Sequence, residues 1–108
     1  MHLTDVREVF EVMPKRFNPD AAQGMDAVLQ FEITGDGGGT WVLLIRDGAC
    51  QVREEIHENP NLSLSMKGVI WLSIVNRELN AVRAFMSGRL KIKGDMSLAQ
   101  KIPELFSL

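Results

Sequence analysis

The chain has 108 residues and a mass of 12.1 kDa, the size of one compact domain, which we expect to span residues 1–108. It is 45% hydrophobic and 24% charged, a composition that excludes a disordered or fibrous protein. The formal net charge of −2 disfavours a nucleic-acid-binding domain, and no apolar run approaches the roughly 20 residues of a membrane span.

Residue types that carry chemistry are few. The single cysteine, Cys50, excludes an internal disulfide, is typical of a reducing compartment, and stands in an apolar alternation that favours a buried thiol over a nucleophile. His57 lies in a polar stretch typical of a solvated loop. Glu54, Glu55 and Glu58 have no acid or nucleophile to pair with. We therefore expect no enzyme activity, no metal and no cofactor.

The first segment has the pattern of an amphipathic helix. Apolar residues recur there at spacings of three and four, at Val6, Val9, Phe10, Met13 and Phe17. We expect a helix over about residues 4–16 that Pro14 ends or bends. One or two further helical turns are predicted from Asn18 to Ala22, ended by Gly24. The first residues lack a basic segment followed by an apolar stretch, so we expect no signal peptide and a cytoplasmic location.

Four strands are predicted next. Alternation over residues 25–34 predicts a half-buried strand, and the apolar run over residues 41–45 predicts a central one. Between them, the glycine cluster over residues 35–39 favours a hairpin turn over a phosphate loop, because a strand and no Lys-Ser/Thr pair follows it. Asp47 and Gly48 predict a second hairpin leading into a strand around residues 50–53. A short fourth strand is expected over residues 62–66.

Helices dominate the remainder. Residues 67–75 predict a buried helix, and Asn80 can cap a short helix that Gly88 closes. A fifth strand follows over residues 89–93, and then a last helix. Pro103 disfavours helical geometry at Ile102, so we expect a kink or break there and an apolar tail beyond it.

This order predicts an α+β domain with a five-stranded, mainly antiparallel sheet covered on one face by about five short helices. Because helices join the fourth and fifth strands, we expect these two to pair parallel by a right-handed crossover.

The apolar helices have two interpretations. Periodicity alone favours an ordinary core. A ligand cavity is favoured by an apolar tail after Pro103, which can act as a lid, and by internal methionines, which adapt to variable contents. These methionines are Met13, Met25, Met66, Met86 and Met96.

Three motifs resemble one known family. Residues 78–96 read ELNAVRAFMSGRLKIKGDM, residues 16–19 read RFNP, and residues 59–61 read NPN before a Leu-x-Leu-x-Met that ends at Met66. Together they resemble the sterol carrier protein 2 (SCP2) family over nearly the whole chain, as a stand-alone, bacterial-type copy of its sterol-binding domain.

The resemblance implies a five-stranded sheet with helices on one side, enclosing an apolar tunnel. It also implies binding of sterols, fatty acids, fatty acyl-CoA or phospholipids, possible intracellular lipid transfer, and no catalysis. By resemblance, the tunnel is lined by inward apolar residues of the helices and sheet: Phe10, Met13, Phe17, Leu29, Phe31, Ile33, Leu64, Met66, Trp71, Leu72, Val75, Val82, Phe85, Met86, Leu90, Ile92, Met96, Ile102, Leu105 and Phe106.

The basic residues Arg89, Lys91 and Lys93 have two interpretations. Charges on the solvent face of a strand protect a sheet edge from aggregation. Alternatively, these three side chains contact anionic lipid headgroups at a membrane.

A second function stays open beside lipid carriage. In it, the chain is a non-catalytic accessory domain whose apolar groove binds a partner segment or the other copy in a homodimer. The family includes such accessory proteins in isoprenoid-quinone metabolism. No nucleic-acid partner is expected.

Overall fold

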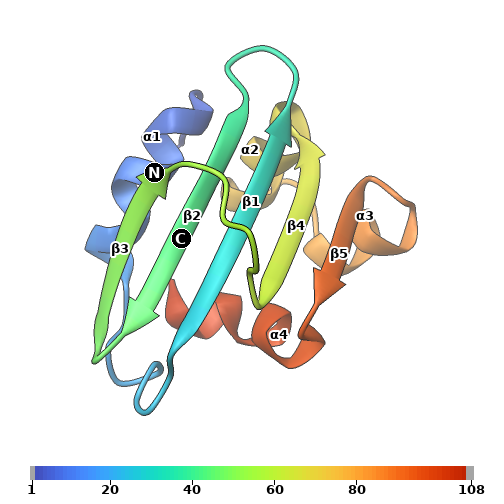
Figure 1. Cartoon of the computed structure of the whole chain (residues 1–108). Helices are drawn as coiled ribbons and strands as arrows, with labels where there is room; N and C mark the ends of the chain where they lie inside the picture. Colours follow the sequence, from blue (N-terminus) through green and yellow to red (C-terminus); the bar gives the residue numbers. More distant parts are fainter. Residues whose placement is uncertain (1, 107–108) are drawn as a thin grey trace.

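The structure, a computed structural model, describes residues 2–106. Four α-helices, one short 3-10 helix and five strands follow one another in these residues (Figure 1). In chain order they are α1 (Val6–Val12), η1 (Met13–Arg16), β1 (Ala27–Thr34), β2 (Gly39–Arg46), β3 (Ala49–Glu54), β4 (Leu62–Lys67), α2 (Gly68–Val75), α3 (Ala81–Met86), β5 (Leu90–Gly94) and α4 (Met96–Leu105).

The strands form one sheet in the order β3-β2-β1-β4-β5. Only β1 and β4 pair parallel, so the predicted α+β class with a mainly antiparallel sheet is confirmed. The expected parallel pairing of the fourth and fifth strands is wrong. Two helices, α2 and α3, join these strands and bring the chain back beside the end of β4, where Met66 pairs with Leu90 in an antiparallel register.

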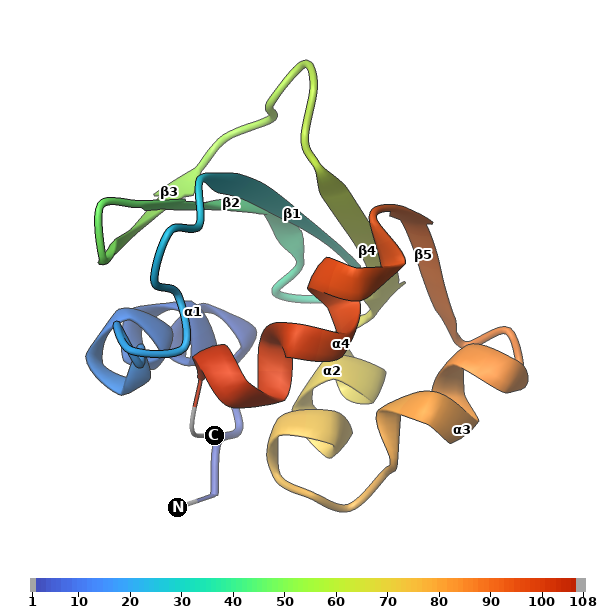
Figure 2. The same ribbon diagram turned by 90° about the horizontal axis from the view of Figure 1, so that it is seen from below.

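All the helices lie on one side of the sheet (Figure 2). The other face is crossed by residues 55–61, which connect β3 to β4 in front of β2 and β1 (Figure 1). Gln30 on β1 is buried beneath this connection, and its Oε1 accepts a hydrogen bond of 2.8 Å from the His57 N–H. His57 therefore lies in a loop, as predicted, but is half-buried.

The core lies between the helices and the inner face of the sheet. Alternate residues of the three central strands are buried there, as the period of two requires: Ala27, Leu29, Phe31, Ile33, Trp41, Leu43, Ile45, Leu62, Leu64 and Met66. At its centre, Phe10 of α1 stacks on Trp41 with ring centroids 4.5 Å apart. Phe31 and Trp71 complete this aromatic cluster, with their centroids 5.2 Å apart. Helices and sheet are thus joined through four rings.

Two predicted helical features are wrong. Residues 19–24 form turns and not a helix, with the Ala22 N–H donating to the Pro19 carbonyl. Of the kink or break expected at Ile102, the break is wrong, because α4 continues through Pro103 to Leu105. One proline removes one helical hydrogen bond, and the burial of Leu105 and Phe106 holds the last turn in place. The tail residues 107–108 lie outside the described residues.

Two motifs of the sequence meet in space. Asn61 precedes β4, and its side-chain oxygen accepts a 2.7 Å hydrogen bond from the Val28 N–H of β1. The Asn61 carbonyl accepts a 2.9 Å hydrogen bond from the N–H of Asp95, just after β5. Between them, Gly94 adopts a φ of +104°, and a β-carbon at this position would overlap the Asn61 carbonyl. These motif residues therefore fix the lower ends of three strands.

We expect Gly94→Ala to lower the free energy of unfolding by at least about 2 kcal/mol. A methyl group there would collide with the Asn61 carbonyl, which the Asp95 N–H holds in place, and the positive φ strains any side chain. Gly88→Ala is the matched control, since Gly88 also has a positive φ (+80°) but faces open space. Urea unfolding measures both, and equal losses would contradict the steric argument.

Candidate functional site

α3 is a short helix at the β5 edge of the sheet. The Asn80 side chain caps it by accepting hydrogen bonds from the N–H groups of Val82 (2.8 Å) and Arg83 (3.2 Å). Within the helix, Ala84 is completely buried. The helix contacts β5, at the edge of the molecule in both views (Figures 1 and 2). This helix therefore adds little to the central core.

Most large side chains of α3 are apolar and exposed. The exposed fractions are 64% for Val82, 41% for Phe85 and 80% for Met86. Spacings of three and four residues put these side chains on one face of the helix, and Ala84 lies on the other. We call Val82, Phe85 and Met86 the α3 face. An apolar face turned to solvent at helical spacing is a feature that ordinary core packing does not require.

The helix layer also covers β5 incompletely. Leu90 faces the helices and is buried, but Ile92, the next inward residue, is only half-buried. α4 contacts β4 and β5, begins with Met96 at 44% exposure, and presents half-buried Ile102 to the core. We call Ile92, Met96 and Ile102 the β5-edge residues. Apolar surface thus remains accessible on both helices that flank β5.

The predicted lining residues fall into three groups. Those buried in the core are Phe10, Met13, Leu29, Phe31, Ile33, Leu64, Met66, Trp71, Val75, Leu90, Leu105 and Phe106. The half-buried ones are Phe17, Leu72, Ile92 and Ile102, and the exposed ones are Val82, Phe85, Met86 and Met96. The structure therefore brings most of them together in the core and gathers the most accessible ones around β5.

One polar atom inside this apolar core has no partner among the described residues. It is the indole Nε1 of Trp71, a residue that is 5% exposed. A buried donor without an acceptor costs about 1–3 kcal/mol, so a ligand oxygen within reach would relieve that cost.

The three predicted headgroup contacts are exposed. Lys91 and Lys93 pair with Ser65 and Ser63 on β4, and strand alternation turns them to the face opposite Ile92, away from the helices. Arg89 precedes β5, and its Nε donates a 2.8 Å hydrogen bond to the Ser87 Oγ. The basic side chains and the α3 face thus share one edge of the molecule.

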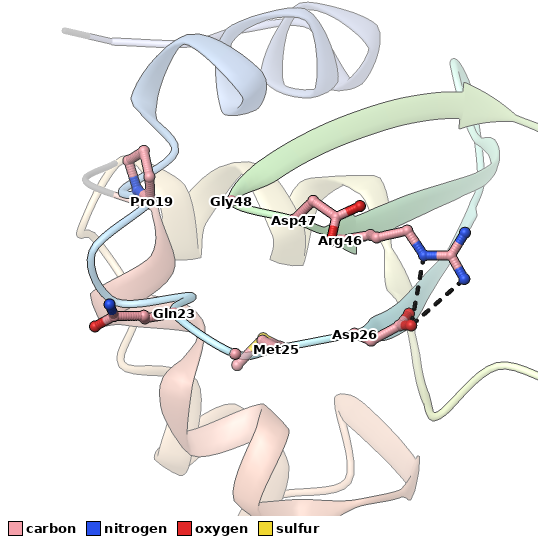
Figure 3. Close-up of a pocket in the computed structure, with 8 residues that line it drawn as sticks. Pro19, Gln23, Met25, Asp26, Arg46, Asp47 and Gly48 are labelled. Atoms are coloured by element: carbon pink, nitrogen blue, oxygen red, sulfur yellow. Dashed lines mark hydrogen bonds and ion pairs between the residues drawn. The ribbon is translucent and has the colours of Figure 1, made fainter.

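A pocket of about 360 Å³ lies at another place, between residues 19–26 and the β2–β3 turn (Figure 3). An ion pair of 3.4 Å joins Arg46 and Asp26 at this pocket. Its other lining residues are Pro19, Gln23, Gly24, Met25, Asp47 and Gly48. Sequence reasoning identified the turn here and named Met25 among the methionines that favour a cavity, but it did not predict this pocket. With Pro19 and Met25 as its only larger apolar side chains, the pocket suits a polar guest better than a hydrocarbon chain.

The described residues include side chains of the types that bind metals or act as nucleophiles. Among residues 2–106, no three His, Cys, Asp or Glu side chains converge as metal ligands would. Within the same residues, no helix has the length and apolar character needed to cross a membrane.

Cys50 is half-buried on β3, and burial raises the pKa of its thiol to about 11. A thiol with so high a pKa is a poor nucleophile.

We expect iodoacetamide to alkylate Cys50 at pH 8 at least ten times more slowly in the folded chain than in urea. Only the thiolate reacts, and the raised pKa keeps the folded thiol protonated. The native rate should climb by about tenfold per pH unit up to pH 9, whereas an unfolded thiol approaches saturation there. Equal rates in both states would contradict the burial of this thiol.

One family model and several curated relatives match this chain. A model described as the SCP-2 sterol transfer family matches residues 10–107. Hydroxysteroid dehydrogenase-like protein 2 from Rattus norvegicus is 32% identical over 107 residues, and the protein of that name from Bos taurus is 33% identical over 103 residues. These matches cover 98% and 94% of this chain, but only 20% and 25% of the relatives. The chain thus spans a quarter or less of these relatives' length.

Solved structures confirm the SCP2-like fold. A double mutant of the sec-alkyl sulfatase PisA1 superposes with a TM-score of 0.84 and 22% identity, over 96% of this chain and 16% of that one. Palmitated SCP2L2 from Aedes aegypti superposes with a TM-score of 0.74 and 20% identity, over 96% of this chain and 93% of that one. At these identities the likeness concerns the fold.

Proposed function

Because the chain belongs to the SCP-2 sterol transfer family, a family of lipid-binding domains, we propose that it binds one long apolar lipid between its helices and its sheet. The candidates are a fatty acid, a fatty acyl-CoA, a sterol or a phospholipid. A fatty acid is the ligand we favour, since a relative of the same fold is described with palmitate. The proposal assigns no catalytic step to the chain.

The observation that carries this proposal is the accessible apolar surface around β5. Ile92 faces the helices from an edge strand and is half-buried, and Ile102 of α4 is half-buried too. In our proposal, the hydrocarbon chain enters between α3 and α4, covers Ile92, and extends toward the buried side chains beyond it. α3 then moves on β5 to admit the ligand, and flexible Met66 and Met96 adapt to it.

The energy of such binding is sufficient without any specific hydrogen bond. Burying a methylene group contributes about 0.8 kcal/mol, so a dozen contribute about 10 kcal/mol. Ordering the ligand and the protein offsets part of that sum. A dissociation constant near 1 μM corresponds to about 8 kcal/mol, which this balance reaches. Low selectivity among lipids follows, because methylene groups of different lipids are equivalent.

We further propose that the bound lipid is carried between membranes, within the cytoplasm. The free thiol of Cys50 is compatible with a reducing compartment. Transfer needs binding that is strong enough to hold the lipid and weak enough to release it, and a micromolar affinity meets both needs.

Displacement of a fluorescent fatty acid tests the proposal. We expect saturable, one-to-one binding of the probe with a micromolar dissociation constant, and displacement by palmitate. Sterol, acyl-CoA and phospholipid, added separately, then rank the ligand classes. Absence of probe binding together with absence of binding to any of the four lipids would overturn the proposal.

A further inference from the structure

The charges of the chain are distributed unevenly. Residues 79–94, which include α3 and β5, contain four cations and no acidic residue: Arg83, Arg89, Lys91 and Lys93. The whole chain has a formal net charge of −2, so the other residues carry −6. The edge that α3 and β5 form therefore carries four cations, bordered in the chain by Glu78 and Asp95, within an otherwise acidic molecule, and a negatively charged partner would orient the molecule with this edge foremost.

The α3 face lies on this basic edge. Its side chains, Val82, Phe85 and Met86, point away from Ala84, the residue through which the helix is anchored. Arg83 follows Val82 in the helix, and Arg89 lies just beyond its end. An apolar helical face bordered by cations is the arrangement found in helices that lie in a membrane interface.

We propose that the α3 face inserts into the surface of an anionic lipid bilayer, while Arg89, Lys91 and Lys93 contact its headgroups. Because α3 also borders the β5-edge residues, docking would place the entry of the lipid site at the membrane. The inference rests on the proposed lipid-carrying function, since docking serves the transfer of lipid. Vesicle binding, however, can be measured whether or not the chain carries a lipid.

The basic side chains and the α3 face contribute differently to docking. Lys91 and Lys93 lie on the outer face of the edge strand β5, on the side of the sheet opposite the helices, so they attract an anionic surface at a distance and lose effect in salt. The α3 face acts only on contact, because its contribution is burial of apolar surface in the interface. An anionic bilayer can attract the basic side chains and also bury the α3 face. A free phosphate can attract only the basic side chains.

Sedimentation with vesicles measures the docking. We expect binding to vesicles of phosphatidylcholine with about one-third phosphatidylglycerol, and at least tenfold weaker binding to pure phosphatidylcholine. Raising the salt concentration from 50 mM to 500 mM should weaken the binding to anionic vesicles by a similar factor. Equal binding to both vesicle types, or no binding to either, would overturn the inference.

Paired variants locate the contact. Val82→Thr with Met86→Gln keeps the shape and helix propensity of α3, and should weaken anionic-vesicle binding about tenfold. The matched control is Val69→Thr with Ile56→Thr, which alters side chains that are 67% and 77% exposed on α2 and on the β3–β4 connection. We expect the control to change binding by less than twofold. An equal loss in both pairs would overturn the assignment to α3.

A second set of variants tests the position of the charges, since the two variants have the same net charge. Each cation near an anionic surface strengthens binding about fivefold, so Lys91→Gln with Lys93→Gln should weaken it about twenty-five-fold in low salt. Lys15→Gln with Arg53→Gln removes the same charge from other parts of the chain and should change binding by less than threefold. Equal losses would show a non-specific attraction and contradict the basic edge.

Two further measurements, fatty-acid binding and sedimentation velocity, distinguish membrane docking from lipid binding and from dimer formation. Fluorescent fatty-acid binding without vesicles should be unchanged in the Lys91→Gln, Lys93→Gln variant, whose substituted side chains face away from the helices and the proposed lipid site. A chain that binds this probe but no vesicles would contradict the docking alone, whereas a chain that docks but binds no lipid would contradict the proposed function alone. If Val82→Thr with Met86→Gln instead dissociates a dimer in sedimentation velocity and the variant still binds vesicles, the α3 face binds a second copy and the inference is wrong.

Discussion

Replacing Phe31 with Ala is expected to lower the free energy of unfolding by about 3–5 kcal/mol. Phe31 is completely buried on β1, with ring centroids 5.5 Å from Phe10 and 5.2 Å from Trp71. Its removal therefore leaves a cavity where α1, α2 and the sheet meet. Because small domains are stable by only about 5–15 kcal/mol, this variant is expected to be close to unfolding at 37 °C.

Urea unfolding followed by tryptophan fluorescence measures this loss. Both tryptophans, Trp41 and Trp71, belong to the aromatic cluster, so their emission reports the packing directly. Phe31→Leu is the control, since it retains most of the volume and should cost less than half as much. A loss below about 1 kcal/mol for Phe31→Ala would show that this cluster is not the centre of the core.

Replacing Ile92 with Glu is expected to weaken binding of a fluorescent fatty acid at least thirtyfold. In the proposed complex the hydrocarbon chain covers Ile92, and a carboxylate there would have to lose its water without gaining a partner. It would also repel the carboxylate of the fatty acid. Thirtyfold corresponds to about 2 kcal/mol.

The sheet provides a matched control for this variant. Val52 is the equivalent residue on β3, the opposite edge strand: it faces the helices and is half-buried, as Ile92 is. Val52→Glu should cost similar stability but change fatty-acid affinity by less than threefold. If both variants weaken binding equally, the loss comes from general destabilisation, and the β5-edge location of the ligand is wrong.

Alternation predicted the strands of this chain well. The period of two over residues 25–34 anticipated β1, and the apolar run over residues 41–45 anticipated a strand covered on both faces. Val42 on the outer face is indeed completely buried. Local hydrogen-bonding and packing requirements set such patterns, and they can be read without knowledge of the neighbouring strands.

Features that depend on distant contacts were not predictable in the same way. Pro103 opposes a helix locally, but α4 continues because Leu105 and Phe106 are buried against other segments. Its last turn is held there by the Asn18 N–H, which donates a 2.8 Å hydrogen bond to the Leu105 carbonyl. The pairing of β4 with β5 likewise depends on where α2 and α3 return the chain. Neither the continuation of α4 nor the pairing of β4 with β5 can therefore be predicted from the local sequence alone.

The candidate site shows a sharper limit of sequence reasoning. A helix with apolar residues at Val82, Phe85 and Met86 has the same pattern whether that face meets the core or the solvent. The structure decides that it meets the solvent, because Ala84 faces the protein. The sequence motif around Gly94, in contrast, is explained by the fold. Gly94 packs against the Asn61 carbonyl, where the ends of the strands meet.

Native mass spectrometry of the protein mixed with an equimolar amount of palmitate tests the lipid-binding account most directly. The account predicts one palmitate per chain, retained in the Val52→Glu variant and lost in the Ile92→Glu variant. A chain that carries no palmitate under conditions that preserve its fold, or that carries equal amounts in both variants, would contradict it.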